Sequence, residues 1–146
     1  DVTVKGIGFI ITLGILLGSL AAALTACSPH GYISTLVVPP ERAAQLTVIR
    51  LPLLEGSGQT WIISVDEHHV LGLRSGEHAT VTVPAGDRII TSDCVTAFPL
   101  ILPGAPIRVP VQAGGHHYVT LGSCMMAEIT ETTAAGLMAR TTPLRR

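Results

Sequence analysis

Two pairs of adjacent histidines are the residues of this sequence best suited to bind a metal ion. The chain has six histidines among 146 residues, and four of them form the pairs His68-His69 and His116-His117. Neighbouring residues of a strand point to opposite faces of a sheet, so each pair offers at most one imidazole to a shared site. If the two segments paired side by side, one imidazole from each could bind zinc or copper. Two ligands are too few for a structural zinc site, and we expect surface or turn histidines with no metal bound.

Other residue types that carry chemistry are present, but they do not form a known catalytic pattern. The sequence contains no Gly-x-Ser-x-Gly elbow, no paired carboxylates in an acid–base frame and no glycine-rich phosphate loop between a strand and a helix. Gly114-Gly115 is typical of a hairpin turn, and Met125-Met126 is typical of a core strand. We therefore expect no catalytic residues, no cofactor and no enzyme activity.

Residues 1–26 form an apolar segment with one basic residue near its start. Lys5 precedes an apolar run from Ile7 to Leu24, which ends in small residues. A positive start, an apolar middle and a small-residue end make up a secretory signal peptide. The run also approaches the minimum length that crosses a bilayer core of about 30 Å, so these residues could instead be a retained membrane anchor helix.

The four residues that close this segment, Leu24-Thr25-Ala26-Cys27, match a short pattern at every position. They resemble the lipobox of bacterial lipoproteins, Leu-(Ala/Ser/Thr)-(Gly/Ala)-Cys. The resemblance implies that Cys27 receives a diacylglyceryl group, that the chain is cut before it, and that the new amino terminus is acylated, for example with palmitate. One acyl chain holds a protein only marginally, whereas two or more hold it stably. Ser28 resembles lipoproteins that are sorted to the outer membrane, facing the periplasm.

The two remaining cysteines form an even pair if Cys27 carries lipid. Cys94 and Cys124 both lie at the ends of predicted strands, and an exported domain lies in an oxidising compartment. The alternative is a redox-active or metal-binding thiol pair, but there is no Cys-x-x-Cys motif and no basic cluster that would lower a thiol pKa. We therefore predict a structural disulfide between Cys94 and Cys124, worth about 3.5–4 kcal/mol in the chain-entropy model.

Beyond Cys27 we expect a lipidated tether in residues 27–44 and a β-sandwich in residues 45–142. The body breaks into short apolar runs separated by turn residues, which is typical of an all-β sandwich. Residues 78–83 alternate between polar and apolar, and we expect Ala79, Val81 and Val83 to be buried. Pro84–Asp87 is predicted to be a tight turn that leads into a paired strand. Pro110 cannot donate to a ladder and predicts an edge strand.

Two shorter segments have ambiguous patterns. The run Ile33–Val38 could form a short strand or lie against the domain, and prolines follow it at positions 39 and 40. Thr132–Met138 could be a short helix or more strand. Residues 28–32 are typical of a solvated linker.

Several turn motifs of the body stand in a recognisable order. They are Arg50, Asp66-Glu67, Leu73–Gly76, Pro84–Asp87 and Ala113–Val119. In these motifs residues 45–130 resemble PEGA-type domains, and especially a family of small bacterial lipoproteins of unknown function. The resemblance implies an immunoglobulin-like or transthyretin-like sandwich of about seven strands, and it brings no known catalytic residues. Asp66-Glu67 stands where that family has Asp-Gly.

Composition limits the partners of this protein. The net charge is −1, so no global field attracts nucleic acid. We expect a periplasmic lipoprotein that is bound to the membrane through its lipid and has a binding or structural role, as an accessory subunit of a cell-envelope assembly. One alternative is a periplasmic metal-binding protein that uses His68, His69, His116 and His117. The other is a single-span membrane subunit with an uncleaved anchor.

Overall fold

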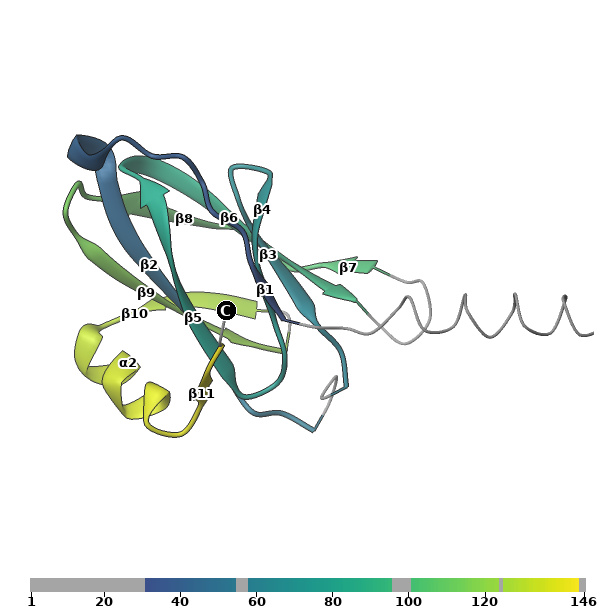
Figure 1. Cartoon of the computed structure of the whole chain (residues 1–146). Helices are drawn as coiled ribbons and strands as arrows, with labels where there is room; N and C mark the ends of the chain where they lie inside the picture. The colour runs from purple at the N-terminus through teal and green to yellow at the C-terminus, as the bar shows by residue number, and fades with distance from the viewer. Residues whose placement is uncertain (1–30, 55–57, 96–100, 124, 145–146) are drawn as a thin grey trace, which may run out of the picture.

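The computed structural model describes residues 31–54, 58–95, 101–123 and 125–144. These residues form two β-sheets that pack face to face, with one short α-helix outside them (Figure 1). The predicted all-β sandwich is thereby confirmed. The predicted signal or anchor helix and the lipid attachment residue Cys27 lie outside the described residues. Within the described ranges, no helix has the length and apolar character needed to cross a membrane.

The first sheet, sheet A, has the strand order β1-β4-β3-β6-β7, and β8 also pairs with β6. All its neighbours run antiparallel. Its strands are β1 (Tyr32–Ile33), β3 (Trp61–Val65), β4 (His68–Leu73), β6 (Gly86–Val95), β7 (Ile101–Pro103) and β8 (Ile107–Val111). Because β8 pairs with β6 alone among the described strands, the edge position predicted from Pro110 is confirmed.

The second sheet, sheet B, has the strand order β10-β9-β2-β5-β11. Its strands are β2 (Ala43–Arg50), β5 (Glu77–Pro84), β9 (His116–Gly122), β10 (Met125–Ile129) and β11 (Thr142–Pro143). The central strand β2 runs antiparallel to β5 and parallel to β9, and β11 runs parallel to β5. The described residues thus contain eleven strands where about seven were expected. Three of them, β1, β7 and β11, are only two or three residues long and too short to show a pattern in the sequence.

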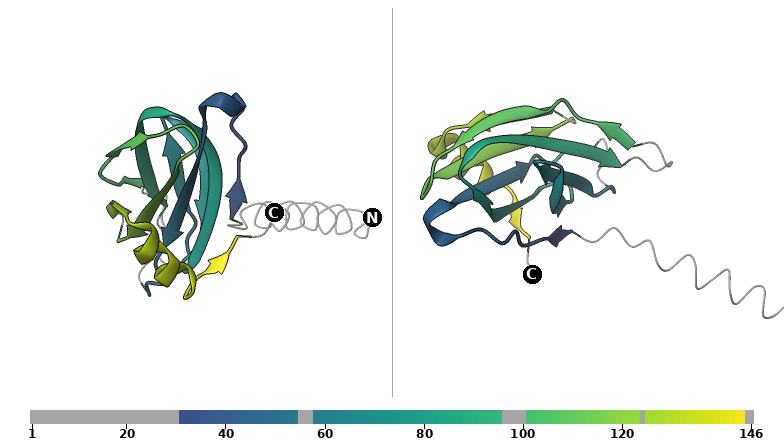
Figure 2. Two further views of the ribbon diagram at one scale, coloured as in Figure 1. Left: turned by 90° about the vertical axis from the view of Figure 1, so that its left-hand side faces the viewer. Right: turned by 90° about the horizontal axis from the view of Figure 1, so that it is seen from above.

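The core lies between the two sheets and is built mainly from aliphatic side chains, as the composition requires. In β5 the predicted alternation is confirmed, with Ala79, Val81 and Val83 buried. The largest fully buried apolar side chains of this core come from both sheets: Leu46, Val48, Ile63, Val65, Val70, Leu71, Leu73, Val83, Ile90 and Leu121. Figure 2 shows the two sheets as separate layers, seen from above.

Strand β2 is covered on both faces, which explains why its residues from Leu46 to Arg50 are all buried. One face lies in the core, and the other packs on helix α2 (Glu131–Met138) through Ile49. The helix begins where the Thr130 side chain accepts a hydrogen bond from the Thr133 N–H, at 3.3 Å. Of the two structures that the sequence allowed for residues 132–138, the chain therefore adopts the helix.

The connection Pro84–Asp87 corrects one expectation. It is a tight turn, but β5 belongs to sheet B and β6 to sheet A, so the two strands it joins do not pair. The chain crosses from one layer to the other at this turn. Gly86 has a φ of 118°, a backbone conformation that favours glycine at this crossing. Gln112–Gly115, which includes the expected Gly114-Gly115 hairpin turn, likewise connects β8 in sheet A to β9 in sheet B.

Residues 34–42, which we call the strap, connect β1 in sheet A to β2 in sheet B. The Ser34 N–H donates to the Val70 carbonyl at 2.8 Å, and Leu36 packs against the core. The strap ends in the 3₁₀ helix η1 (Pro40–Arg42), whose Arg42 carbonyl accepts from the Ala85 N–H at 2.7 Å. The structure therefore places β1, the strap and the start of β2 on the domain, ahead of Gln45, where we expected the sandwich to begin.

The sandwich has two ends, which we name by one residue each. The Asp66 end comprises the β3–β4 turn Asp66-Glu67, the crossing Pro84–Gly86 and the strap. The Leu54 end comprises residues 51–54, the β4–β5 connection 74–76, and Gly122 and Met125. The strand β3 runs from Trp61 at the Leu54 end to Val65 at the Asp66 end, a rise of about 13 Å.

Candidate functional site

The structure describes one of the two cysteines that were predicted to form a disulfide. Cys94 lies on β6 opposite Trp61, is only 2% exposed, and forms a disulfide bond. Cys124 lies outside the described residues, so its pairing with Cys94 stays a prediction. The buried position of Cys94 in the core is that of a structural cysteine, because a reactive thiolate requires solvent access.

The two histidine pairs lie in different sheets. His68 and His69 begin β4 in sheet A, whereas His116 and His117 begin β9 in sheet B, and these two strands are not neighbours. The side-by-side pairing on which the metal hypothesis depended is therefore absent from the described strands. Across those same residues, no group of three or more His, Cys, Asp or Glu side chains is placed to hold a metal ion.

Each of these four histidines has a hydrogen-bond partner of its own. In sheet A, His68 Nδ1 donates to the Asp66 carbonyl at 2.8 Å, and His69 Nδ1 lies 3.0 Å from Ser64 Oγ. In sheet B, His116 stacks on Tyr118 and hydrogen-bonds through Nε2 to Thr47 Oγ1 at 2.8 Å. These contacts are those of histidines that fix local structure.

His117 joins the turn before β9 to the edge strand β10. Its Nε2 accepts from the Gln112 N–H at 3.2 Å, and its Nδ1 donates to Glu128 Oε1 at 3.2 Å. The accepting role of Nε2 requires that this nitrogen carry no proton. A metal at Nε2 would have to displace the Gln112 N–H.

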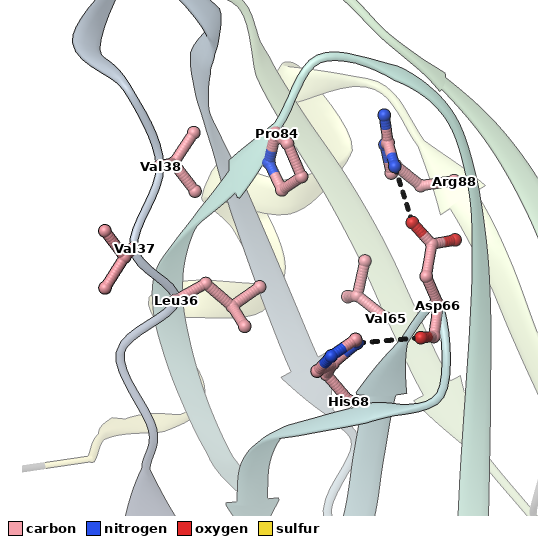
Figure 3. Close-up of a pocket in the computed structure, with 8 residues that line it drawn as sticks. All are labelled: Leu36, Val37, Val38, Val65, Asp66, His68, Pro84 and Arg88. Atoms are coloured by element: carbon pink, nitrogen blue, oxygen red, sulfur yellow. Dashed lines mark hydrogen bonds and ion pairs between the residues drawn. The ribbon is translucent and has the colours of Figure 1, made fainter.

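A hollow at the Asp66 end brings several segments of the described chain together (Figure 3). The strap supplies one apolar wall, and β3, β4 and the β5–β6 crossing supply the rest. Its lining residues are Leu36, Val37, Val38, Val65, Asp66, His68, Pro84 and Arg88. The volume is about 220 Å³, below the roughly 300–1,000 Å³ of small-molecule sites. The hollow therefore suits one inserted apolar side chain better than a whole ligand.

Asp66 organises the polar side of this hollow. Asp66 and Glu67 have φ values of 47° and 68°, as in a two-residue hairpin turn of type I′. The Asp66 carboxylate accepts from Arg88 Nη1 at 2.6 Å and from the Ile89 N–H at 3.0 Å. Burial raises the pKa of Asp66, but these two hydrogen bonds and the positive charge of Arg88 outweigh it and hold the pKa below its ordinary value. The carboxylate thus fixes the turn to β6.

A buried arginine closes the opposite end of the core. Arg50 is 1% exposed, and its Nη1 donates to the carbonyls of Gln59 at 2.6 Å and Leu73 at 2.7 Å. Its guanidinium lies 3.8 Å from the centre of the Trp61 ring. Burial lowers the pKa of Arg50 to about 10, and the negative charge of Glu77 partly opposes this shift. The resemblance had singled out Arg50, but its burial depends on carbonyls distant in sequence.

The Leu54 end exposes large apolar side chains. Leu54 is 97% exposed and Met125 is 69% exposed. The Leu51 N–H donates to the Leu121 carbonyl at 3.0 Å, and Met125 pairs opposite Gly122, so residues 51–54 adjoin the β9–β10 turn. The sequence offered no signal for this surface, because its members come from separate segments.

In comparisons with known proteins, no family model, curated protein or solved structure matches the chain.

Proposed function

We propose that this protein is an exported bacterial lipoprotein, held in the cell envelope by acyl chains on Cys27. The observation that carries the proposal is the segment Leu24-Thr25-Ala26-Cys27, placed directly after an apolar run with a basic residue ahead of it. The domain beyond it faces the periplasm, and Ser28 supports the outer membrane as its destination. Acylation on more than one position gives stable attachment.

The disulfide at Cys94 supports an oxidising compartment. Disulfides persist in the periplasm and in secreted proteins, whereas the cytosol keeps thiols reduced. Cys94 is disulfide-bonded and buried in the core. Export through a signal segment would bring the domain to a compartment where this bond forms.

We assign the sandwich to the immunoglobulin-like or transthyretin-like architecture of PEGA-type domains. The positive φ values at Asp66 and Glu67 support this assignment, because Asp-Gly, the usual pair of the family at this turn, suits the same backbone conformation. The tight crossing at Pro84–Asp87 also stands where the family has its Pro-Gly turn. Both motifs shape the fold and neither carries chemistry.

The role of the domain is to bind a protein or to serve as a structural subunit of an envelope assembly. The hollow at the Asp66 end supports this role, since its size and apolar wall suit an inserted side chain of a partner protein. Val37 is fully exposed beside it and adds apolar surface at its rim.

Mass spectrometry of the protein from its native envelope tests the anchor. We expect a chain that begins at Cys27 and carries a diacylglyceryl group together with an amide-linked acyl chain. The variant Cys27→Ala should be released from the membrane fraction or retain the uncleaved segment. An unmodified Cys27 in a membrane-bound chain that starts before it would instead support the single-span alternative.

Affinity purification from detergent-extracted envelopes tests the assembly role. The wild-type protein should retain the same envelope proteins in repeated purifications, and Val37→Asp should lose them because a charge at the rim opposes apolar docking. Ala135→Asp is the matched control, since it also places a charge on an exposed apolar position, but on helix α2 and outside the hollow. Equal retention by both variants would exclude the hollow as the binding surface.

A further inference from the structure

The exposed apolar residues of the Leu54 end identify a second surface, separate from the hollow. Leu54 and Met125 expose most of their side chains, and Leu51 and Leu53 lie next to Gly122, which pairs with Met125. Leu53 is fixed there because its N–H donates to Ser75 Oγ at 3.1 Å. Apolar groups held on a rigid edge in this way lose little conformational entropy when they are covered.

The chain enters the domain at this same end. A Cβ at Gly31 would lie 3.0 Å from the Gly72 carbonyl and 3.1 Å from Glu77 Oε2, so Gly31 lies beside the β4–β5 connection. Tyr32 then pairs with Gly72 and leaves its ring partly exposed. Tyrosine is a residue that favours the boundary between lipid and water.

Few residues separate this end from the lipid attachment residue. Four chain steps lead from Cys27 to Gly31, and even a fully extended chain would span only about 14 Å over them. The ten-residue strand β6 alone is about 30 Å long, so the domain is longer than its tether. Because Gly31 lies at the Leu54 end, a lipid on Cys27 keeps this end close to the bilayer.

We infer that the Leu54 end rests on the lipid bilayer and inserts Leu54 and Met125 among the headgroups. This inference depends on the proposed lipidation of Cys27. The bilayer is the occupant that the short tether brings to this surface, and apolar side chains that enter the interface by about 5–10 Å contribute to membrane binding. The Asp66 end and its hollow then face away from the membrane, toward the periplasm.

Tryptophan fluorescence with the full acylated protein tests this orientation. Three variants each add one tryptophan at an exposed position: Leu54→Trp, Met125→Trp and Val37→Trp. Each is reconstituted into vesicles of phosphatidylethanolamine and phosphatidylglycerol, with and without bromine on the acyl chains. Bromine should quench most of the added emission at positions 54 and 125 and none at position 37, which lies at the opposite end. Buried Trp61 gives the same background in all three.

The possible outcomes separate this inference from the proposal on which it depends. If mass spectrometry shows acylated Cys27 but positions 54 and 125 are quenched no more than position 37, the orientation is wrong and the lipoprotein stands. Stronger quenching at position 37 would mean that the Asp66 end contacts the bilayer. If Cys27 carries no lipid and the protein does not float with the vesicles, the proposed function itself fails.

Discussion

The two ends of the sandwich are closed by different physical means. At the Asp66 end a carboxylate joins a turn to the neighbouring strand through Arg88 and the Ile89 N–H, on a surface that water reaches. At the Leu54 end the buried guanidinium of Arg50 satisfies two carbonyls and packs on Trp61. Outside these closures, one end has a small hollow and the other has exposed leucine and methionine.

The difference shows how one small core can support two separate surfaces. Solvent screens the ion pair of the Asp66 end, so it contributes little energy and mainly fixes geometry. The arginine of the Leu54 end is almost completely covered, and its loss would remove both hydrogen bonds that it donates there. We therefore expect stability to be concentrated at the Leu54 end and local conformational control at the Asp66 end.

Loss of the disulfide should produce the largest effect. The variants Cys94→Ala and Cys124→Ala should each lower the free energy of unfolding by about 3.5–4 kcal/mol, because the cross-link restricts the unfolded chain. Urea denaturation measures the change, and thiol titration should find one free thiol in the acylated single variants. The double variant should be no less stable than either single variant. If Cys124→Ala leaves Cys94 bonded, the predicted pairing is incorrect.

Removal of the buried guanidinium should have the next largest effect. Arg50→Met keeps the unbranched inner part of the side chain but removes the hydrogen bonds to the carbonyls of Gln59 and Leu73, which should cost about 2–4 kcal/mol. The matched control is Arg74→Met, whose side chain is 51% exposed, so its effect should stay within about 0.5 kcal/mol. Thermal and urea unfolding measure both variants. A similar loss in both would contradict the central role of Arg50.

Local patterns in the sequence predicted which strands form better than they predicted which strands pair with one another. The alternation in residues 78–83 correctly identified the buried face of β5, and Pro110 correctly identified an edge. The turn at Pro84–Asp87 was recognised, but the pairing expected after it was wrong, because the same tight turn can join strands of one sheet or of two. Periodicity shows which face of a strand is buried and does not show which strand lies beside it.

The surfaces were harder to predict, because each combines segments that are distant in sequence. The hollow joins the strap to two strand connections, and the sequence allowed residues 36–38 either to form a short strand or to lie against the domain, as they do. The exposure of Leu54 and Met125 depends on the packing of residues 51–54 beside Gly122. An apolar residue next to a turn has the same local pattern whether the fold covers it or leaves it exposed.

The turn at the Asp66 end provides a paired test with smaller effects of opposite sign. Glu67→Gly should stabilise the protein by about 0.5 kcal/mol, since glycine adopts its positive φ without steric cost. Asp66→Gly gains the same freedom but loses the bonds to Arg88 and Ile89, and it should destabilise the protein by about 1 kcal/mol. Urea denaturation compares the two. Stabilisation by both substitutions would show that the Asp66 carboxylate does not hold this end.

The smallest expected effect is a pH dependence at the edge of the Leu54 end. His78 Nδ1 hydrogen-bonds to Thr141 Oγ1 at 2.7 Å, beside the short strand β11. Burial lowers the pKa of His78 below 6.5. The imidazole therefore binds a proton more readily in the unfolded chain than in the folded chain. The stabilisation that neutral His78 gives to the pairing of β11 is therefore present above pH 6.5. It is lost as the pH falls through the pKa of His78 in the folded protein.

Hydrogen exchange at this edge measures the loss directly. The N–H groups of Thr142 and Leu144 donate to the carbonyls of Gly76 and His78, and both should lose protection between about pH 7 and about pH 5 after correction for intrinsic rates. The Leu51 N–H, which donates to the Leu121 carbonyl, is the internal control and should lose less. His78→Gln should remove the difference between the two pH values. Unchanged protection in the wild-type protein would mean that β11 stays paired with β5 whether or not His78 is charged.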